Sequence, residues 1–172
     1  MDRPVRKEHR LTGFDYSRNG AYFITICTRN KQYLFWNDYD IRNVGAAFGG
    51  PHSKKTLTEY GKIVREELKK IPSIYPDIVF VPKFVIMPNH IHLIIVLNTF
   101  SESGPPKAAP TIGSIINKFK GTVSKKAGFK VCQKNFYDRI IRNNAEYSAY
   151  WQYIENNPIN WENDELFVNE EN

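Results

Sequence analysis

Two histidines one residue apart, His90 and His92, stand where an apolar run of the sequence begins. The stretch from His90 to Val96 predicts a β-strand, and it follows a bend at Met87-Pro88-Asn89. Successive side chains of a strand point to opposite faces, so the two imidazoles share one face and Ile91 points to the other. Imidazole is the commonest protein ligand of transition metals, so this pattern suggests a metal site in a sheet. The alternative is a solvated pair at a strand end.

A second pair with a regular spacing is Tyr153 and Asn157, which are four residues apart. At about 100° per residue these two side chains lie on the same side of a helix, at the margin of its apolar stripe. A tyrosine in that position is commonly a packing residue with a solvated hydroxyl. The spacing alone therefore leaves its role open.

The elements that must position these residues follow the order strand, helix, strand, strand, helix, strand, and a third helix comes after them. This order predicts an α+β protein with a ferredoxin-like (βαββαβ) antiparallel sheet, two helices on one face, and a C-terminal helix that carries Tyr153. Strands are expected at 21–28, 78–86, 90–96 and 136–142, and helices at about 56–71, 111–127 and 143–157.

Capping residues indicate where the helices begin and end. Thr56 and Glu59 have the spacing of a capping box, and Pro72 is expected to stop that first helix. Gly128 follows the second helix, and Asn143 precedes the third.

Charge is distributed unevenly along the chain. Residues 1–142 hold all 24 Lys and Arg with 11 Asp and Glu, a net +13, whereas residues 143–172 hold seven acids and no base. A basic body suggests a polyanionic partner, because Lys and Arg that neutralise phosphates release counterions on binding; the alternative is a merely solvated surface. We divide the chain into a basic arm (1–19), one catalytic domain (20–160) and an acidic tail (161–172).

The size and the cysteines limit the class of protein. A chain of 172 residues is long enough for one domain with a sizeable core. Cys27 and Cys132 form neither a disulfide framework nor a paired metal motif, which favours a reducing interior. No secretory segment or membrane-spanning apolar run is evident, so we expect a soluble, cytoplasmic protein without a membrane partner.

Four motifs of the sequence, with their order along the chain, resemble those of one family. They are the His90-Ile91-His92 motif after Met87-Pro88-Asn89, the run Phe136-Tyr-Asp-Arg-Ile-Ile-Arg142, the run Tyr153-Ile-Glu-Asn-Asn-Pro158, and the opening Leu11-Thr-Gly-Phe-Asp-Tyr16 with Ala21-Tyr-Phe-Ile-Thr-Ile-Cys27. Together they resemble the REP-associated tyrosine transposases, which belong to the single-tyrosine HUH transposases and endonucleases. The resemblance covers about residues 10 to 167. Cys132 departs from it, because a Trp is expected there, and this puts local packing or a DNA contact in doubt.

The resemblance implies a chemistry and a set of site residues. His90, His92 and Asn157 would hold a divalent metal, Mg²⁺ or Mn²⁺, and Tyr153 would be the nucleophile. The protein would cleave single-stranded DNA, at hairpins of palindromic repeats, through a 5′-phosphotyrosine intermediate and transfer the strand in DNA transposition. It would act as a monomer or a homodimer.

Two other classes of function fit parts of the sequence. A ferredoxin-like module that binds nucleic acid without chemistry, or a domesticated transposase, would need no nucleophile; RNA-binding modules of this fold place aromatic residues on the central strands, where this chain has His90 and His92. A metal-dependent phosphodiesterase that uses water would not need Tyr153. Replacing Tyr153 by Phe separates these classes.

Overall fold

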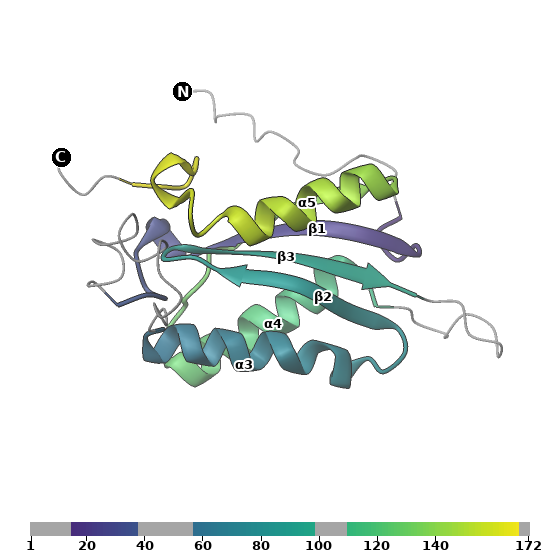
Figure 1. The fold of residues 1–172 in the computed structure, drawn as a ribbon. Coiled ribbons are helices and arrows are strands. Elements are labelled where there is room, and N and C mark those ends of the chain that lie inside the picture. Colours follow the sequence, from purple (N-terminus) through teal and green to yellow (C-terminus); the bar gives the residue numbers. More distant parts are fainter. Residues whose placement is uncertain (1–14, 38–56, 99–109, 169–172) are drawn as a thin grey trace, which may run out of the picture.

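The sheet that carries the two histidines has four antiparallel strands in the order β2-β3-β1-β4 (Figure 1). The computed structural model describes residues 15–37, 57–98 and 110–168. The strands are β1 (Gly20–Cys27), β2 (Val79–Ile86), β3 (His90–Leu97) and β4 (Tyr137–Ile141), and the helices are α3 (Glu59–Ile74), α4 (Ile112–Ala127) and α5 (Asn144–Asn156). Two short 3-10 turns, η1 (Arg29–Lys31) and η2 (Trp161–Asn163), complete the described elements. The predicted α+β class is confirmed.

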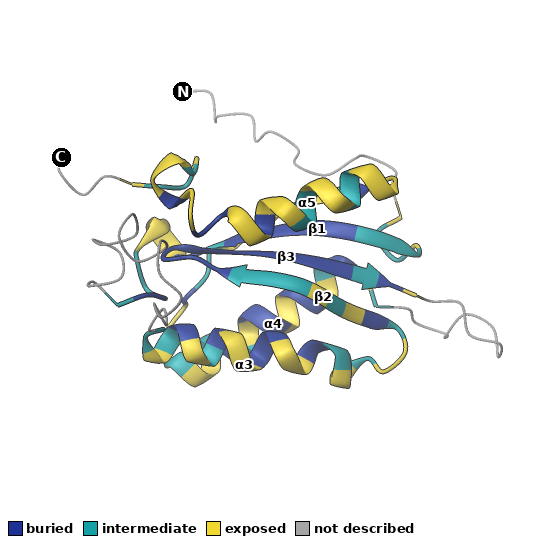
Figure 2. Ribbon diagram, in the orientation of Figure 1, coloured by how far each residue is buried: buried dark blue, intermediate teal, exposed yellow. Residues whose placement is uncertain are grey.

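The sheet separates two helical layers. Helices α3 and α4 cover one face and α5 lies along the other (Figure 1). The main hydrophobic core lies between the sheet and α3 and α4, and it contains Ile24, Ile26, Ile91 and Leu93, all fully buried. A smaller cluster with Phe23, Ile94 and Ile154 packs beneath α5. In Figure 2 the helices therefore show a buried stripe toward the sheet and an exposed opposite side.

The start and end of α3 differ from the prediction. Leu57 pairs with Trp36 as an isolated β-bridge, so its backbone is extended and the helix cannot begin at Thr56. The N-cap is Thr58, whose Oγ1 accepts a hydrogen bond from the Gly61 N–H at 3.1 Å. Pro72 does not stop the helix, which continues to Ile74, because a proline in the last turn removes only one backbone hydrogen bond.

The other two helices begin at residues that cap them. Thr111 and Ser114 form a reciprocal capping box at the start of α4, and Gly128 ends this helix with a left-handed φ of 81°. Asn143 caps α5 by accepting a hydrogen bond from the Glu146 N–H at 2.9 Å. The first residue of α5, and with it the register of Tyr153 along the helix, is thus determined by local chemistry at the first turn.

The turn between β2 and β3 is held by the segment that follows β1. The Leu34 and Phe35 N–H groups donate to the Pro88 carbonyl, and the Trp36 indole donates to the Ile86 carbonyl at 2.7 Å. Gly61 lets α3 approach this segment, because a Cβ there would collide with the Phe35 carbonyl oxygen. The bend at 87–89 is therefore held by hydrogen bonds to the carbonyls of Ile86 and Pro88, directly before β3 begins.

Residues 161–168 pack against the same end of the sheet. Trp161 is fully buried, and its ring contacts those of Tyr33, His90 and Phe167. The Tyr33 hydroxyl also donates to the Val168 carbonyl and accepts from the Val168 N–H. The part of the predicted acidic tail that the structure describes is thus joined to the core.

Other predictions concern residues that the structure does not cover. Most of the basic arm (1–14), the loop at 49–55 and nearly all of the connection at 98–110 lie outside the described residues, as do Glu170 and Glu171. Among the described residues, none of the helices has both the length and the apolar character that crossing a bilayer requires.

Candidate metal and tyrosine site

His90, the first residue of β3, is fully buried, and its hydrogen bonds determine which ring nitrogen is protonated. The Asn89 amide nitrogen donates to the Leu166 carbonyl at 2.7 Å, so the Asn89 Oδ1 faces the His90 Nδ1, 2.8 Å away. Because Oδ1 can only accept, the His90 Nδ1 carries the proton. The Nε2 is then an unprotonated nitrogen with a free lone pair, which is the form that binds a metal.

His92 lies beside His90 on the same face of the sheet, with 4.4 Å between the ring centroids. Its Nδ1 is 2.9 Å from the hydroxyl of Thr25, the residue opposite it on β1, and its Nε2 is 3.4 Å from the Tyr153 hydroxyl. Ile91 points into the main core. The alternation expected from a strand therefore places both imidazoles toward α5.

Asp164 joins the two histidines to the helix. Its Oδ2 is 3.9 Å from the His90 Nε2 and 3.4 Å from the Tyr153 hydroxyl, and it accepts a hydrogen bond from the Asn157 amide at 2.8 Å. Its Oδ1 accepts from the Leu166 N–H at 2.7 Å, which holds the carboxylate in place. His90, His92 and Asp164 each offer one ligand atom, and these atoms all lie within 4.8 Å of one another.

Two buried polar atoms of this cluster have no hydrogen-bond partner within the part of the chain that the structure describes. They are the Nε2 of His90 and the Oδ1 of Asn157. A buried polar atom without a partner costs about 1–3 kcal/mol, so such atoms are uncommon in the interior of a protein. An imidazole nitrogen, an amide oxygen and a carboxylate form a donor set that suits a divalent cation.

The environment keeps the histidines neutral and the tyrosine protonated. Burial lowers the pKa of His90 to about 3, which the Asn157 side chain opposes to a smaller extent, and burial also lowers the pKa of His92. Burial, followed by the charge of Asp164, raises the pKa of Tyr153 to about 12. Neutral imidazoles are ready to bind a metal, whereas the phenol needs a nearby cation to become a nucleophile at neutral pH.

A cleft of about 890 Å³ opens onto this cluster between α5 and the sheet. Tyr153 lies at its wall with 45% of its surface exposed, so the hydroxyl is accessible from the cleft while the histidines stay buried. Phe23, Tyr137 and Tyr150 add aromatic surface to the lining. The accessible Tyr153 hydroxyl thus lies next to a buried set of potential metal-binding atoms.

The structure brings together all four residues that the sequence analysis selected: His90, His92, Tyr153 and Asn157. It adds Asp164, which the sequence analysis assigned to the acidic tail. No spacing rule identifies Asp164, because the chain turns twice between Asn157 and this residue, through Pro158 and through η2. Only its carboxylate marked Asp164 as a candidate ligand, and the neighbouring Glu162 and Glu165 carry the same group.

Comparisons with known proteins place this geometry in context. The fold is similar to that of a solved REP-associated tyrosine transposase bound to a REP hairpin, with a TM-score of 0.58 and 19% sequence identity over 94% of this chain and 74% of that one. The chain therefore has a transposase-like fold. No family model matches the sequence.

A relative in sequence defines the family. The chain belongs to the same family as an uncharacterized protein of Haemophilus influenzae, to which it is 35% identical over an alignment of 181 positions that covers 95% of this chain and 93% of the relative.

Proposed function

We propose that this protein is an HUH-type tyrosine transposase that cleaves and rejoins single-stranded DNA at hairpins. The observation that carries the proposal is the cluster itself: two neutral histidines, an amide and a carboxylate converge within reach of one accessible tyrosine hydroxyl. The strand order β2-β3-β1-β4 and the location of Tyr153 on α5 support this proposal. The similar fold of a transposase bound to a hairpin supports the choice of substrate.

His90, His92 and Asn157 are the proposed ligands of a divalent cation, and Asp164 lies beside them, where it accepts a hydrogen bond from the Asn157 amide. The two atoms without partners, the His90 Nε2 and the Asn157 Oδ1, fit this role. When bound, Mg²⁺ or Mn²⁺ supplies positive charge that polarises the scissile phosphate and lowers the pKa of the tyrosine. Imidazole ligands favour Mn²⁺ over Mg²⁺.

Tyr153 is the proposed nucleophile. Its oxygen attacks the phosphorus, the bond to the 3′ oxygen breaks, and the products are a 5′-phosphotyrosine and a free 3′-OH that takes up a proton. Asp164, 3.4 Å from the hydroxyl, is placed to accept the proton that Tyr153 loses. Attack by a 3′-OH on the phosphotyrosine reverses the reaction, so strands are rejoined without ATP.

The other parts of the chain have supporting roles in this proposal. The basic body up to residue 142 contacts the phosphates, because it holds every Lys and Arg of the chain. We retain residues 20–160 as the catalytic domain, with residues 161–168 as the segment that adds Asp164 to the site. Arm residues 1–19 would lie along the DNA backbone.

The test is the covalent intermediate. The protein is incubated with end-labelled single-stranded hairpin DNA and Mn²⁺, and adducts are resolved on a denaturing gel. We expect an adduct with the unmodified protein and with Tyr150→Phe, a tyrosine one turn earlier on α5, and none with Tyr153→Phe. Cleavage that continues unchanged in Tyr153→Phe would indicate hydrolysis by water, and binding without cleavage in every variant would indicate a recognition module.

A further inference from the structure

A second, smaller pocket of about 160 Å³ lies beside the cleft, between β1 and the segment that leads into β4. Three residues, Thr25, Cys27 and Tyr137, line both hollows, so the pocket and the cleft share a wall. The remaining lining residues are Gln133, Asn135 and Phe136. Gln133, Asn135 and Phe136 have no role in the proposed cleavage chemistry.

The sheet register places the pocket next to the histidines on the same face. On β1, Cys27 is opposite His90, and Thr25 is opposite both His92 and Tyr137. Neighbouring strands are about 4.8 Å apart, so Tyr137 on β4 is about 10 Å from His92 on β3. A nucleotide next to a phosphate at the histidines can reach this pocket.

The segment that forms the outer wall is held in place before any ligand arrives. The Gln133 N–H donates to the Cys27 carbonyl at 3.0 Å, and the buried amine of Lys120 donates to the carbonyls of Gln133 and Lys134 at 3.1 Å and 2.7 Å. The same amine lies 5.6 Å from the centroid of the Phe136 ring. A wall that is already ordered loses little conformational entropy when a ligand binds.

The side chains of this wall are neutral, and they offer hydrogen bonds and aromatic surface. The side-chain amides of Gln133 and Asn135 belong to the lining, and each presents both a donor and an acceptor. Tyr137 is 40% exposed. No charged residue belongs to the lining in the described part of the chain, which makes a phosphate a poor occupant.

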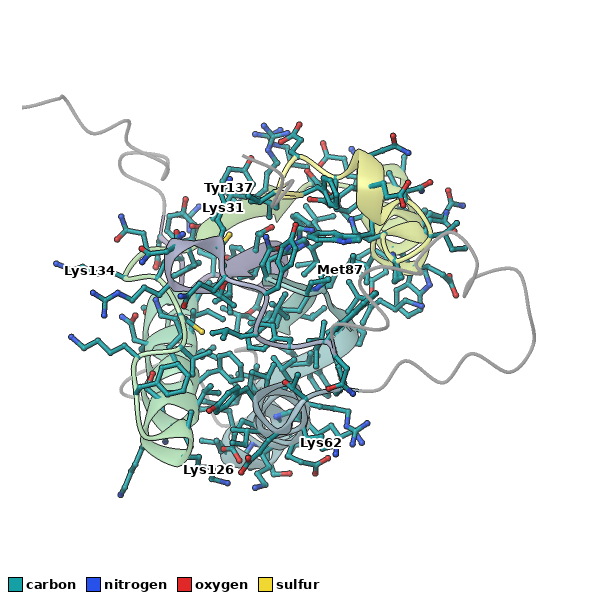
Figure 3. All side chains as sticks on the ribbon, turned by 90° about the vertical axis from the view of Figure 1, so that its left-hand side faces the viewer. Lys31, Lys62, Met87, Lys126, Lys134 and Tyr137 are labelled. Atoms are coloured by element: carbon teal, nitrogen blue, oxygen red, sulfur yellow. The ribbon has the colours of Figure 1, made fainter. Side chains whose placement is uncertain are left out.

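We propose that this pocket binds one unpaired nucleobase of the DNA strand whose phosphate lies at Tyr153. The ring of Tyr137 stacks on the base, and the amides of Gln133 and Asn135 bond to its edge, as amides do in base recognition. Phosphates on either side of this nucleotide contact lysines on the rim, such as the exposed Lys134, which extends away from the molecule in Figure 3. The inference rests on the proposed function and adds a residue-level source of sequence specificity to it.

The test measures binding, so it does not depend on cleavage. The Tyr153→Phe protein is used to select strands from a library of single-stranded DNA with a randomised central stretch. A selected strand is then synthesised with an abasic site at each position in turn, and the affinity for every version is measured. We expect one position near the cleavage point at which base removal weakens binding by about tenfold to a hundredfold.

Matched variants assign that position to the pocket. With Gln133→Ala or Tyr137→Ala in the Tyr153→Phe protein, removal of that base should no longer matter. Lys134→Ala should weaken all strands about equally and lower the salt dependence, because its partner is a phosphate. Phe129→Ala replaces an aromatic residue of similar exposure, 41%, after α4 and should change neither quantity.

The outcomes separate this inference from the proposed function. Base dependence that persists in Gln133→Ala, Asn135→Ala and Tyr137→Ala overturns the pocket, and so does tight binding with no base dependence at any position. In both of these cases the proposed function stands. A protein that binds no single-stranded DNA overturns both.

Discussion

The two faces of the sheet are formed by the same strands, but one face packs the main hydrophobic core and the other carries the polar residues of the candidate site. On the face toward α3 and α4, the central strands present Ile24, Ile26, Ile91 and Leu93, all fully buried in the main core. On the face toward α5, the residues between them include Thr25, His90 and His92, which are also buried but carry polar atoms. The period of two in a strand thus separates a core from a site across the thickness of one sheet.

The difference shows how a small domain supports buried polar groups. The apolar face supplies the stabilisation, at roughly 25 cal/mol for each Å² of apolar surface that is buried. The polar groups on the face toward α5 cost stability, because imidazoles and an amide are removed from water and two of their atoms have no partner within the described residues. The apolar cluster of Phe23, Ile94 and Ile154 on that face offsets part of this cost. Substitutions on the two faces should therefore change different observables, and neighbouring residues of β3 can test this.

The largest effect is expected on the polar face, from His92→Ala. If His92 is a metal ligand, as proposed, its loss removes several kcal/mol of transition-state stabilisation, which is about a thousandfold in cleavage rate. DNA affinity should change little, since it comes mainly from the basic surface. Nicking of labelled single-stranded hairpin DNA with Mn²⁺ measures the cleavage rate, and a binding titration measures the DNA affinity. Undiminished nicking would refute the assignment of His92.

The adjacent substitution on the apolar face, Ile91→Ala, should reverse this pattern. Removing a fully buried Ile from the core costs about 2–5 kcal/mol of unfolding free energy. Urea unfolding measures the loss, and the folded fraction should keep most of its cleavage rate. If Ile91→Ala abolished cleavage while the protein was still folded, the two faces would not be independent.

A smaller effect is expected from Asn89→Ala, which removes the acceptor that orients His90. Loss of such a partner weakens metal affinity by about tenfold to a hundredfold. The Mn²⁺ concentration that gives half-maximal cleavage should rise accordingly. Asn89→Asp keeps the acceptor for His90 and loses the donor to Leu166, so it should retain the affinity. Equal losses in both variants would show that the contact with Leu166, rather than the orientation of His90, is responsible.

The smallest effect is expected from Glu67→Gln, which removes a charge between α3 and α4. The hydrogen bond from Lys126 on α4, at 2.6 Å, is the main cause of a lowered pKa at Glu67 on α3. A carboxyl whose pKa is lower in the folded state stabilises the protein above its unfolded pKa near ~4.3, and this contribution is lost as the pH falls through the folded value. Glu67→Gln should lose about 1 kcal/mol at neutral pH and less at low pH. Urea unfolding at several pH values measures this, and an equal loss at every pH would contradict it.

Local patterns predicted much of this protein because the relevant forces act over short distances. The strand that begins at His90 and the helix capped by Asn143 follow from alternation and from one side-chain hydrogen bond, and the structure confirms both elements. The start of α3 was predicted two residues too early, at Thr56, because the bridge between Leu57 and Trp36 joins residues that are distant in sequence. Rules based on neighbouring residues cannot predict that contact.

The candidate site divides in the same way. The spacing of His90 and His92, and that of Tyr153 and Asn157, determined that each pair would share a face of its own element. Only the tertiary structure decided that the two faces meet, since this depends on how α5 packs over β1 and β3 through Phe23, Ile94 and Ile154. It also decided that Asp164 enters the site, because the burial of Trp161 carries the following residues back onto the histidines. Periodicity acts within one element, whereas burial of apolar surface brings separate elements together.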